Sequence, residues 1–298
     1  MRKYIIKVGV ILLLLLTLLW FRRGLNTQVE EGFLTQSSPY VLKRDNEVYD
    51  SFYIDHYDKL FSTVDYTSQD IESIETYTVV KPRESIFLDI GCGTGELLKK
   101  MEEKQWNCFG VDKSQNMVNK AKEKVKSVQI DCNDVLNDPM LYENKTFSHI
   151  ICSHFTLYEI EDKAILFKHC YHWLQGDGYL VVHLLDPKDF KRAIPSLNLS
   201  TVSSKVKKST ITNNEFKYRN DYTKQTDSKM LQIETFTDNH NGHVRKNEKL
   251  WYMESKESIM HTAQTIGFTI VREIPYQKTL EDSHQYLVIM VKPLSGSE

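Results

Sequence analysis

Apolar residues along the middle of the chain recur at two different spacings, and the two spacings alternate. Short apolar runs, typical of buried strands, are separated by stretches with apolar residues three and four positions apart, typical of amphipathic helices. The predicted strands are residues 85–89, 108–111, 127–130, 149–152 and 179–185. The predicted helices between them are residues 96–104, 114–126 and 163–173. Strands that alternate with helices predict an α/β fold with a parallel sheet and right-handed crossovers.

The alternation stops at Asp186-Pro187, just after a strand that the turn Gly176-Asp-Gly178 is expected to begin. Residues 187–254 are polar and rich in Lys, Ser, Thr and Asn, and we expect a strand-rich insertion here. Two alternating runs within it predict antiparallel strands: residues 215–222 and 230–237. One more helix and two more strands follow: residues 255–266, 268–274 and 285–291. Gly267 is the expected C-cap of that helix.

The N-terminal segment has a different pattern. Val8–Phe21 is almost uninterrupted apolar sequence with basic residues on both sides, which predicts a single transmembrane helix within residues 1–24. A cleaved signal peptide and a buried helix are the alternatives, although the small residues of a cleavage site do not follow the apolar run. The basic residues are nearly equal on the two sides, so they do not choose an orientation.

Two further segments connect this anchor to the α/β part. Residues 25–45 are polar with Gly, Pro and Ser, and predict a tether. From Asn46 to about Tyr77, aromatic residues recur at helical spacing, which predicts a helical region. We therefore expect an anchor at 1–24, a tether at 25–45 and one α/β domain at 46–298.

Charge divides the chain into unlike parts. The 38 basic and 40 acidic residues give a net charge of −2, but residues 1–23 hold five basic residues and no acid, so the rest carries −7. An acidic body argues against nucleic acid as a partner. Between Asp186 and Leu231, ten basic residues stand against five acids. That segment is either a solvated loop or a surface for an acidic substrate or an anionic lipid.

Cysteine usage bears on the compartment. The five cysteines are an odd number, none forms a CxxC pair, and four lie on or beside predicted strands. This pattern predicts reduced thiols packed in a core, with neither a disulfide framework nor a metal site. We therefore expect the body to face a reducing, cytosolic compartment.

The segment that carries the most chemical information is Ile86-Phe-Leu-Asp-Ile-Gly-Cys-Gly-Thr-Gly95. A predicted strand runs into three alternate glycines and a helix follows at once, a geometry that lets the backbone turn tightly and approach a ligand. The next strand ends at Asp112, where an acid can accept hydrogen bonds from two ribose hydroxyls. A dinucleotide and S-adenosylmethionine both suit this outline. Glu96, where a dinucleotide site needs a small residue, would repel a pyrophosphate and favours S-adenosylmethionine.

Five landmarks follow one another at the spacing of a known family. They are Leu88–Gly95, Gly110–Val118, Asn133–Val135, Phe147–Ser153 and Trp173–Leu180. Together they resemble the motifs of the class I S-adenosylmethionine-dependent methyltransferases, with departures at Ser148, Gln175 and Asp177. The resemblance covers roughly residues 82–186 and 255–293. It implies a Rossmann-like, seven-stranded, mostly parallel sheet with an antiparallel last strand, and places the insertion between strands five and six.

The resemblance also implies S-adenosylmethionine as the methyl donor, and we expect no metal. The donor-binding residues that it implies are Asp89, Gly91, Cys92, Gly93, Gly95, Asp112, Lys113, Met117, Asp134, Val135 and Ser153. Asp134 has an alternative role as a helix N-cap, since Asp favours that position. Methyl transfer from a sulfonium mainly needs proximity and alignment, so catalytic residues are hard to identify from a sequence.

His154 and Tyr57 are the catalytic candidates. His154 follows the fourth predicted strand at the carboxyl edge of the sheet, and an unperturbed histidine titrates near neutrality. A structural histidine is the alternative. Residues 46–80 resemble the lid helix of small-molecule N-methyltransferases, in which tyrosines reach the donor or the acceptor amine. Tyr57 is the position that this resemblance transfers, and the buried face of an amphipathic helix is the alternative. Further lid candidates are Tyr49, Tyr53 and Tyr66.

These observations predict a membrane-anchored methyltransferase that acts on a small-molecule or lipid-type acceptor at nitrogen or oxygen. The sequence lacks the Asn/Asp-Pro-Pro-Tyr signature, which argues against a nucleic-acid base or a glutamine as acceptor. A protein acceptor, a catalytically silent membrane assembly factor and a nucleotide-dependent oxidoreductase are the alternatives. We also expect residues 187–254 to form a lid or a homodimer contact.

Overall fold

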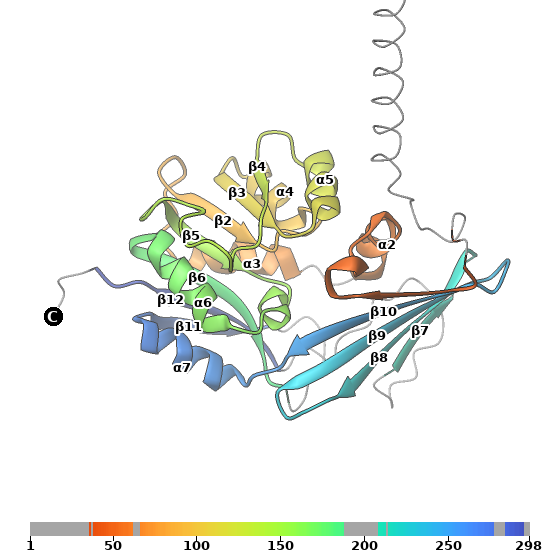
Figure 1. Cartoon of the computed structure of the whole chain (residues 1–298). Coiled ribbons are helices and arrows are strands. Elements are labelled where there is room, and N and C mark those ends of the chain that lie inside the picture. Colours follow the sequence, from red (N-terminus) through yellow and green to blue (C-terminus); the bar gives the residue numbers. More distant parts are fainter. Residues whose placement is uncertain are drawn as a thin grey trace, which may run out of the picture.

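The computed structural model describes residues 36, 38–61, 66–187, 208–212, 214–276 and 284–294, which form two sheets flanked by helices (Figure 1). The strands of the larger sheet are β2 (Ile86–Ile90), β3 (Asn107–Asp112), β4 (Gln129–Cys132), β5 (Phe147–Cys152), β6 (Leu174–Leu185), β11 (Thr269–Pro275) and β12 (Gln285–Val291). Their order across the sheet is β11-β12-β6-β5-β2-β3-β4. β12 runs antiparallel to both of its neighbours, and the other pairs are parallel. The predicted seven-stranded, Rossmann-like sheet is confirmed.

Helices cover both faces of the larger sheet. They are α3 (Tyr66–Tyr77), α4 (Glu96–Glu103), α5 (Gln115–Lys124), α6 (Lys163–Trp173) and α7 (Lys256–Ile266). One apolar core packs α6 and α7 against the sheet, and a second packs α3, α4 and α5 against the opposite face. The chain passes from β2 to β3 on one side and places β5 on the other, which is the strand order that opens a ligand crevice at the carboxyl ends.

Capping residues explain where several helices begin and end. The side chains of Ser114, Asp162 and Ser255 accept backbone N–H groups in the first turns of α5, α6 and α7, and each satisfies a donor that the helix leaves unpaired. Gly267 ends α7 with a φ of +120°, as expected of a glycine C-cap.

One turn prediction is wrong. β6 begins at Leu174, directly after α6, so Gly176-Asp177-Gly178 lies inside the strand and does not precede it. The pairing with β5 is irregular here, because Phe147 faces Leu174 whereas His149 faces Tyr179. Glycine and aspartate are disfavoured in regular strands, and here they mark an irregularity within one.

The smaller sheet is built by the insertion and by a segment that precedes the α/β domain. Its strands are β1 (Tyr40–Arg44), β7 (Lys208–Thr212), β8 (Phe216–Lys224), β9 (Lys229–Asp238) and β10 (Val244–Tyr252), in the order β1-β10-β9-β8-β7. The strand-rich insertion and the strands now seen as β8 and β9 are confirmed. β1 corrects the tether prediction, because its five residues pair in parallel with β10.

β7 and β10 were not predicted, and β10 shows why. Its burial alternates regularly, but the side chains on its buried face include Arg245, Asn247 and Lys249. Buried polar residues erase the alternation of apolar and polar residues on which strand prediction depends.

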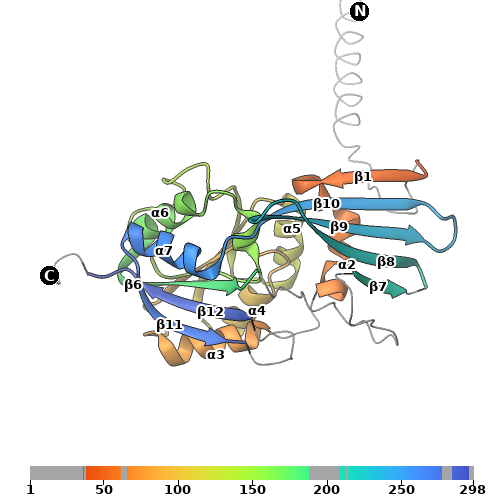
Figure 2. The ribbon, with the colours of Figure 1, turned by 90° about the horizontal axis from the view of Figure 1, so that it is seen from below.

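The predicted helical region 46–77 is three separate elements: η1 (Asp45–Val48), α2 (Ser51–Phe61) and α3. α2 lies on the smaller sheet (Figure 2), where Phe52 and Tyr53 form a core with Phe216 and Phe236. α3 packs on the larger sheet instead. The predicted lid is therefore divided between the two sheets.

Arg245 fastens the start of α2 to the smaller sheet. Its guanidinium donates to the carboxylate of Asp50 at 2.6 Å, to the backbone carbonyl of Val48 at 3.1 Å and to the side-chain oxygen of Asn247 at 2.9 Å. The side chain is 2% exposed, so these bonds replace almost all of its hydration. A buried charge of this kind is stable only while its partners remain.

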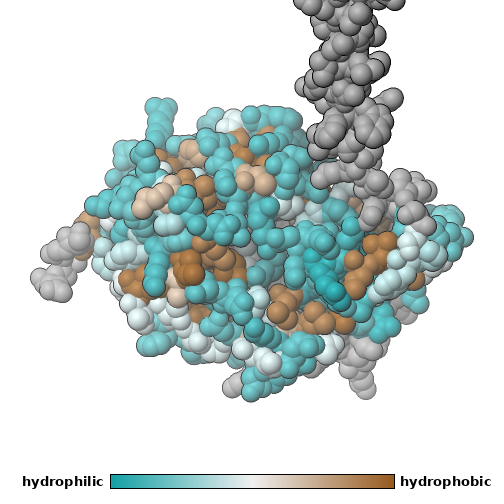
Figure 3. All heavy atoms as spheres, viewed as in Figure 1, coloured by the Kyte–Doolittle hydropathy of each residue, from teal (hydrophilic) through white to brown (hydrophobic). Residues whose placement is uncertain are grey.

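The surface is largely hydrophilic in the direction of Figure 1, with apolar residues in separate patches (Figure 3). Within the described ranges, no helix is long and apolar enough to cross a membrane. The predicted anchor at 1–24, most of the predicted tether and the basic stretch 188–207 lie outside those ranges.

We expect Arg245→Met to lower the free energy of unfolding by about 2 kcal/mol, because it leaves Asp50 and the Val48 carbonyl without their charged donor. Urea unfolding followed by circular dichroism measures this change. The matched control is Arg219→Met, which removes an arginine of the same sheet that is 46% exposed, and it should cost less than about 1 kcal/mol. Equal losses in the two variants would contradict the role assigned to Arg245.

Candidate functional site

A cavity of about 300 Å³ lies at the carboxyl ends of β2 and β3, with one wall from α2. Nine of the predicted site residues line it: Tyr57, Gly91, Gly93, Asp112, Lys113, Met117, Asp134, Val135 and His154. Residues from five separate segments of the sequence thus meet at one place. The volume is at the lower end of the range for small-molecule sites.

The glycine loop between β2 and α4 needs glycine for two different reasons. Gly91 and Gly95 both have left-handed backbones, with φ of +67° and +84°. A Cβ on Gly91 would lie 2.3 Å from the Thr156 side chain, so the loop after β5 is seated directly on it. A Cβ on Gly95 would lie 3.0 Å from that of Ala121, so this glycine allows α4 to pack closely on α5. Gly95 therefore acts through the packing of these two helices and does not line the cavity.

Asp112 is held by two backbone donors at the end of β3. One carboxylate oxygen accepts the N–H of Ser114 at 2.8 Å and the other accepts the N–H of Gly93 at 3.0 Å. Burial raises the pKa of Asp112, and the two backbone hydrogen bonds partly oppose that rise. Each oxygen keeps a further lone pair, so the carboxylate can still accept two hydroxyl groups from a ligand in the cavity.

Four predicted donor-binding residues do not line the cavity: Asp89, Cys92, Gly95 and Ser153. Cys92 is buried beneath the loop, where its sulfur lies 3.1 Å from the position of a Cβ on Gly110. Burial raises the pKa of its thiol, so it stays protonated and acts as an apolar side chain. Asp89 is also buried, which raises the pKa of its carboxyl, as does the nearby charge of Asp112.

One side of the cavity has apolar side chains. Met117, Val135 and Leu136 line it, next to the turn that follows β4. The carboxylate of Asp134 accepts the backbone N–H of Leu136 at 3.0 Å. No helix begins there, so Asp134 orders a turn and is not the helix N-cap of the alternative prediction.

His154 faces the cavity from a strained loop. It and Phe155 have left-handed backbones, with φ of 51° and 69°, and such residues persist only where the surroundings hold them. The His154 Nε2 atom lies 3.4 Å from the hydroxyl of Thr67 and 3.8 Å from the carboxylate of Asp70. Tyr276 donates its hydroxyl to the same carboxylate. Asp70 thus places a fully buried acid behind the predicted acid/base residue.

The lid tyrosines divide into two groups. Tyr53 is buried in the core of the smaller sheet, as the alternative prediction had it, whereas Tyr57 and Tyr49 line the cavity. The Tyr49 hydroxyl donates to Glu159 at 2.6 Å. Burial, and next the charge of Glu159, raise the pKa of Tyr49 well above its usual value, so the phenol remains a donor. Asn116 on α5 donates to the backbone carbonyl of Tyr49 at 2.9 Å, which fixes it at the rim.

Sequence reasoning missed several residues of this site: Asp70, Glu159, Glu161 and Tyr252. Asp70 carries one weak signal, because it is an acid on the apolar face of a helix beside Ile71 and Ile74. Tyr252 carries none, since it reaches the cavity from β10, a strand that the pattern did not reveal.

Comparison with known proteins places this geometry in a family. Residues 61–273 match a family model described as Methyltransferase domain. An uncharacterized methyltransferase of Alkaliphilus oremlandii is 26% identical over 158 residues, which are 50% of this chain and 72% of the relative.

Solved structures with a similar fold include the following two. An S-adenosylmethionine-dependent methyltransferase from Clostridium acetobutylicum has a TM-score of 0.62 at 20% identity, over 81% of this chain and 98% of the other. A sugar N-methyltransferase from Streptoalloteichus has a TM-score of 0.58 at 17% identity, over 84% and 94%. The family model spans more than half of the chain, and its landmarks form one cavity. The chain therefore belongs to the methyltransferase domain family of class I S-adenosylmethionine-dependent methyltransferases, with S-adenosylmethionine as methyl donor.

Proposed function

We propose that this protein transfers a methyl group from S-adenosylmethionine to nitrogen or oxygen of a small-molecule or lipid-type acceptor, and that residues 1–24 anchor it in a membrane. The observation that carries the proposal is the single cavity shared by the glycine loop, the lid tyrosines and His154. The sugar N-methyltransferase with a similar fold supports a small-molecule acceptor, as does an amino pentose methyltransferase from Micromonospora echinaspora, with a TM-score of 0.57 and 14% identity.

The residues present fit the donor. The Asp112 carboxylate offers two acceptors at the spacing of vicinal ribose hydroxyls, and Met117 and Val135 offer an apolar surface for an adenine ring. Bare backbone at Gly93, where a Cβ would meet only the Gly91 carbonyl oxygen at 4.0 Å, leaves room for the methionine part. When bound, the donor supplies a methyl group that its sulfonium charge has already activated.

The protein's contribution to transfer is alignment and proton acceptance. The loop and Asp112 hold one reactant, while Tyr57 and Tyr49 close the cavity against water. An acceptor atom held in line with the activated methyl group would take it up directly, with the donor sulfur as the leaving group. An acceptor that arrives protonated must lose a proton, and His154, with Asp70 behind it, is the group placed to take it.

We expect Asp112→Asn to weaken binding of S-adenosylmethionine about 30-fold, because it removes the charge that accepts the ribose hydroxyls. Calorimetric titration of the full chain measures this affinity. Wild-type affinity should also fall as the pH drops, because protonation of Asp112 removes its charge. The raised pKa of Asp112 means that this fall begins at a higher pH than for an ordinary Asp, whose pKa is about 4. The affinity of the variant should not show this pH dependence. Asp131→Asn on β4 is the control; equal weakening there would refute the assignment.

We expect His154→Asn to slow methyl transfer about 100-fold while donor affinity changes less than about twofold, because the histidine acts on the acceptor. The assay uses labelled donor with fractionated small-molecule, lipid and protein pools, and the labelled fraction identifies the acceptor class. His172→Asn should leave transfer unchanged. Label found in the protein pool alone would contradict a small-molecule or lipid acceptor and indicate a protein acceptor. Absence of transfer to any pool would favour a catalytically silent fold.

We expect the full chain to stay with membranes after alkaline carbonate extraction, because an apolar helix of this length is held by the bilayer core. Intact-mass measurement of the extracted protein distinguishes an uncleaved anchor from a cleaved signal peptide. Release by carbonate, or a mass that lacks the N-terminal segment, would contradict the anchor.

A further inference from the structure

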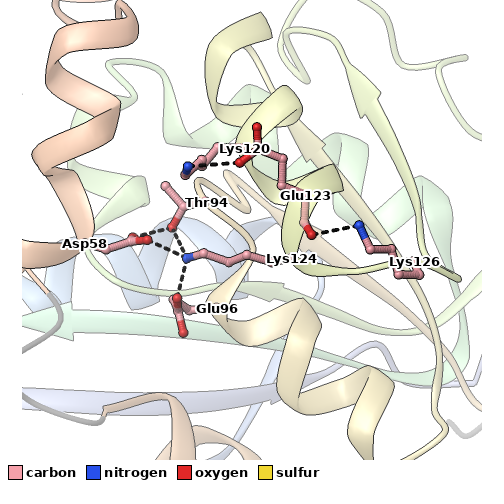
Figure 4. Close-up of polar contacts among 7 residues, drawn as sticks. All are labelled: Asp58, Thr94, Glu96, Lys120, Glu123, Lys124 and Lys126. Carbon is pink, nitrogen blue, oxygen red and sulfur yellow. Dashed lines mark hydrogen bonds and ion pairs between the residues drawn. The ribbon is translucent and has the colours of Figure 1, made fainter.

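Four side chains meet at the junction of α2, the glycine loop, the start of α4 and the end of α5 (Figure 4). The Lys124 ammonium lies 2.6 Å from the Asp58 carboxylate and also pairs with Glu96. The Thr94 hydroxyl donates to the other oxygen of Asp58 at 2.6 Å and accepts from Lys124 at 3.1 Å. Asp58 belongs to α2, Thr94 to the loop, Glu96 to α4 and Lys124 to α5.

This cluster lies next to the cavity assigned to the donor. Thr94 lies between Gly93 and Gly95, in the loop that borders the cavity. Asp58 directly follows Tyr57, whose side chain forms part of the cavity wall. The cluster therefore joins the lid helix to the loop beneath it, at the side of the donor.

We propose that Asp58, Lys124 and Thr94 form a latch that holds α2 over the bound donor, and so sets the rate at which the donor leaves. They are positioning residues, since they act through the lid and not on the reacting atoms. The inference rests on the assignment of the donor to this cavity.

Burial makes the cluster strong enough for this role. The side chains of Lys124 and Asp58 are 19% and 31% exposed, and Thr94 is buried. Charged hydrogen bonds in partly buried positions are stronger than exposed ion pairs. A ligand held under a lid escapes through the open state, so the population of that state governs the escape rate.

Glu96 makes the latch reversible. When α2 moves away, Lys124 keeps its contact with Glu96, and Asp58 moves into water. At this junction, opening therefore breaks the Lys124–Asp58 ion pair and the Thr94–Asp58 hydrogen bond, and Lys124 keeps Glu96 as its partner. A latch built from Lys124 and Asp58 alone would strand an ammonium at the junction.

The test measures dissociation of tritium-labelled S-adenosylmethionine from the full chain, chased with unlabelled donor and sampled by rapid filtration. Lys124→Met should accelerate dissociation about tenfold. Raising the ionic strength from about 0.05 M to about 0.5 M should accelerate dissociation more in the wild type than in the variant, since only the wild type has the Lys124–Asp58 ion pair for salt to screen.

Two more variants keep the test decisive. Lys120→Met removes a lysine of the same helix whose partner, Glu123, is on that helix (Figure 4), and it should dissociate like the wild type. Asp58→Asn conserves size and one Thr94 acceptor, and should accelerate dissociation less than Lys124→Met. If Lys124→Met melts at a lower temperature than the wild type, the dissociation rate of Asp58→Asn provides the test instead.

The outcomes distinguish failure of the latch from failure of the donor assignment. Donor binding with unchanged dissociation in Lys124→Met and Asp58→Asn, or equal acceleration in Lys120→Met, would overturn the latch alone. A wild-type chain that binds no donor would overturn the donor assignment, and the latch with it.

Discussion

The bond between the Gly93 N–H and the Asp112 carboxylate is the constraint on which the site depends. It ties the loop after β2 to the end of the neighbouring strand β3, and the second oxygen of the same carboxylate orders the turn that begins α5. The loop can take this position only because Gly91 has no Cβ, since the Thr156 side chain occupies that space. From α5, Asn116 then holds the backbone of Tyr49. One carboxylate thus connects the sheet, the loop and the lid.

The lid itself depends on charges buried in the smaller sheet. Lys249 is 5% exposed and lies 4.0 Å from Glu159, a residue of the cavity wall, and 3.3 Å from the Tyr53 hydroxyl. Tyr53 in turn donates to Glu234, which is fully buried. A polar interior of this kind costs desolvation and is stable only with correctly placed partners, so it restricts how α2 can sit on the sheet. The insertion therefore positions the helix that carries Tyr57, and it adds Tyr252 to the lining of the cavity.

The sequence predicted the elements whose stability comes from continuous apolar burial. Residues 285–291 were predicted as a strand and form β12 over the same range, and the donor loop was found because its glycines are required by backbone geometry. β10 was missed because its buried face carries charged residues that only tertiary partners make stable. Asp70 was missed for the same reason, since its meeting with His154 joins α3 to the loop after β5. Local sequence patterns indicate which residues are buried and where the chain turns. They do not indicate which polar groups from distant segments will lie in contact.

The charge of the cavity also explains which ligand it favours. Its lining includes four carboxylates and one ammonium group: Asp112, Asp134, Glu159, Glu161 and Lys113. Nearby cations balance part of this negative charge, since Lys229 pairs with Glu161 at 2.8 Å. A positive sulfonium is attracted to such a wall, whereas a pyrophosphate is repelled. Transfer converts the sulfonium into a neutral thioether, so this attraction ends with the reaction. By this charge argument the same carboxylates contribute more to binding of the donor than to binding of its product.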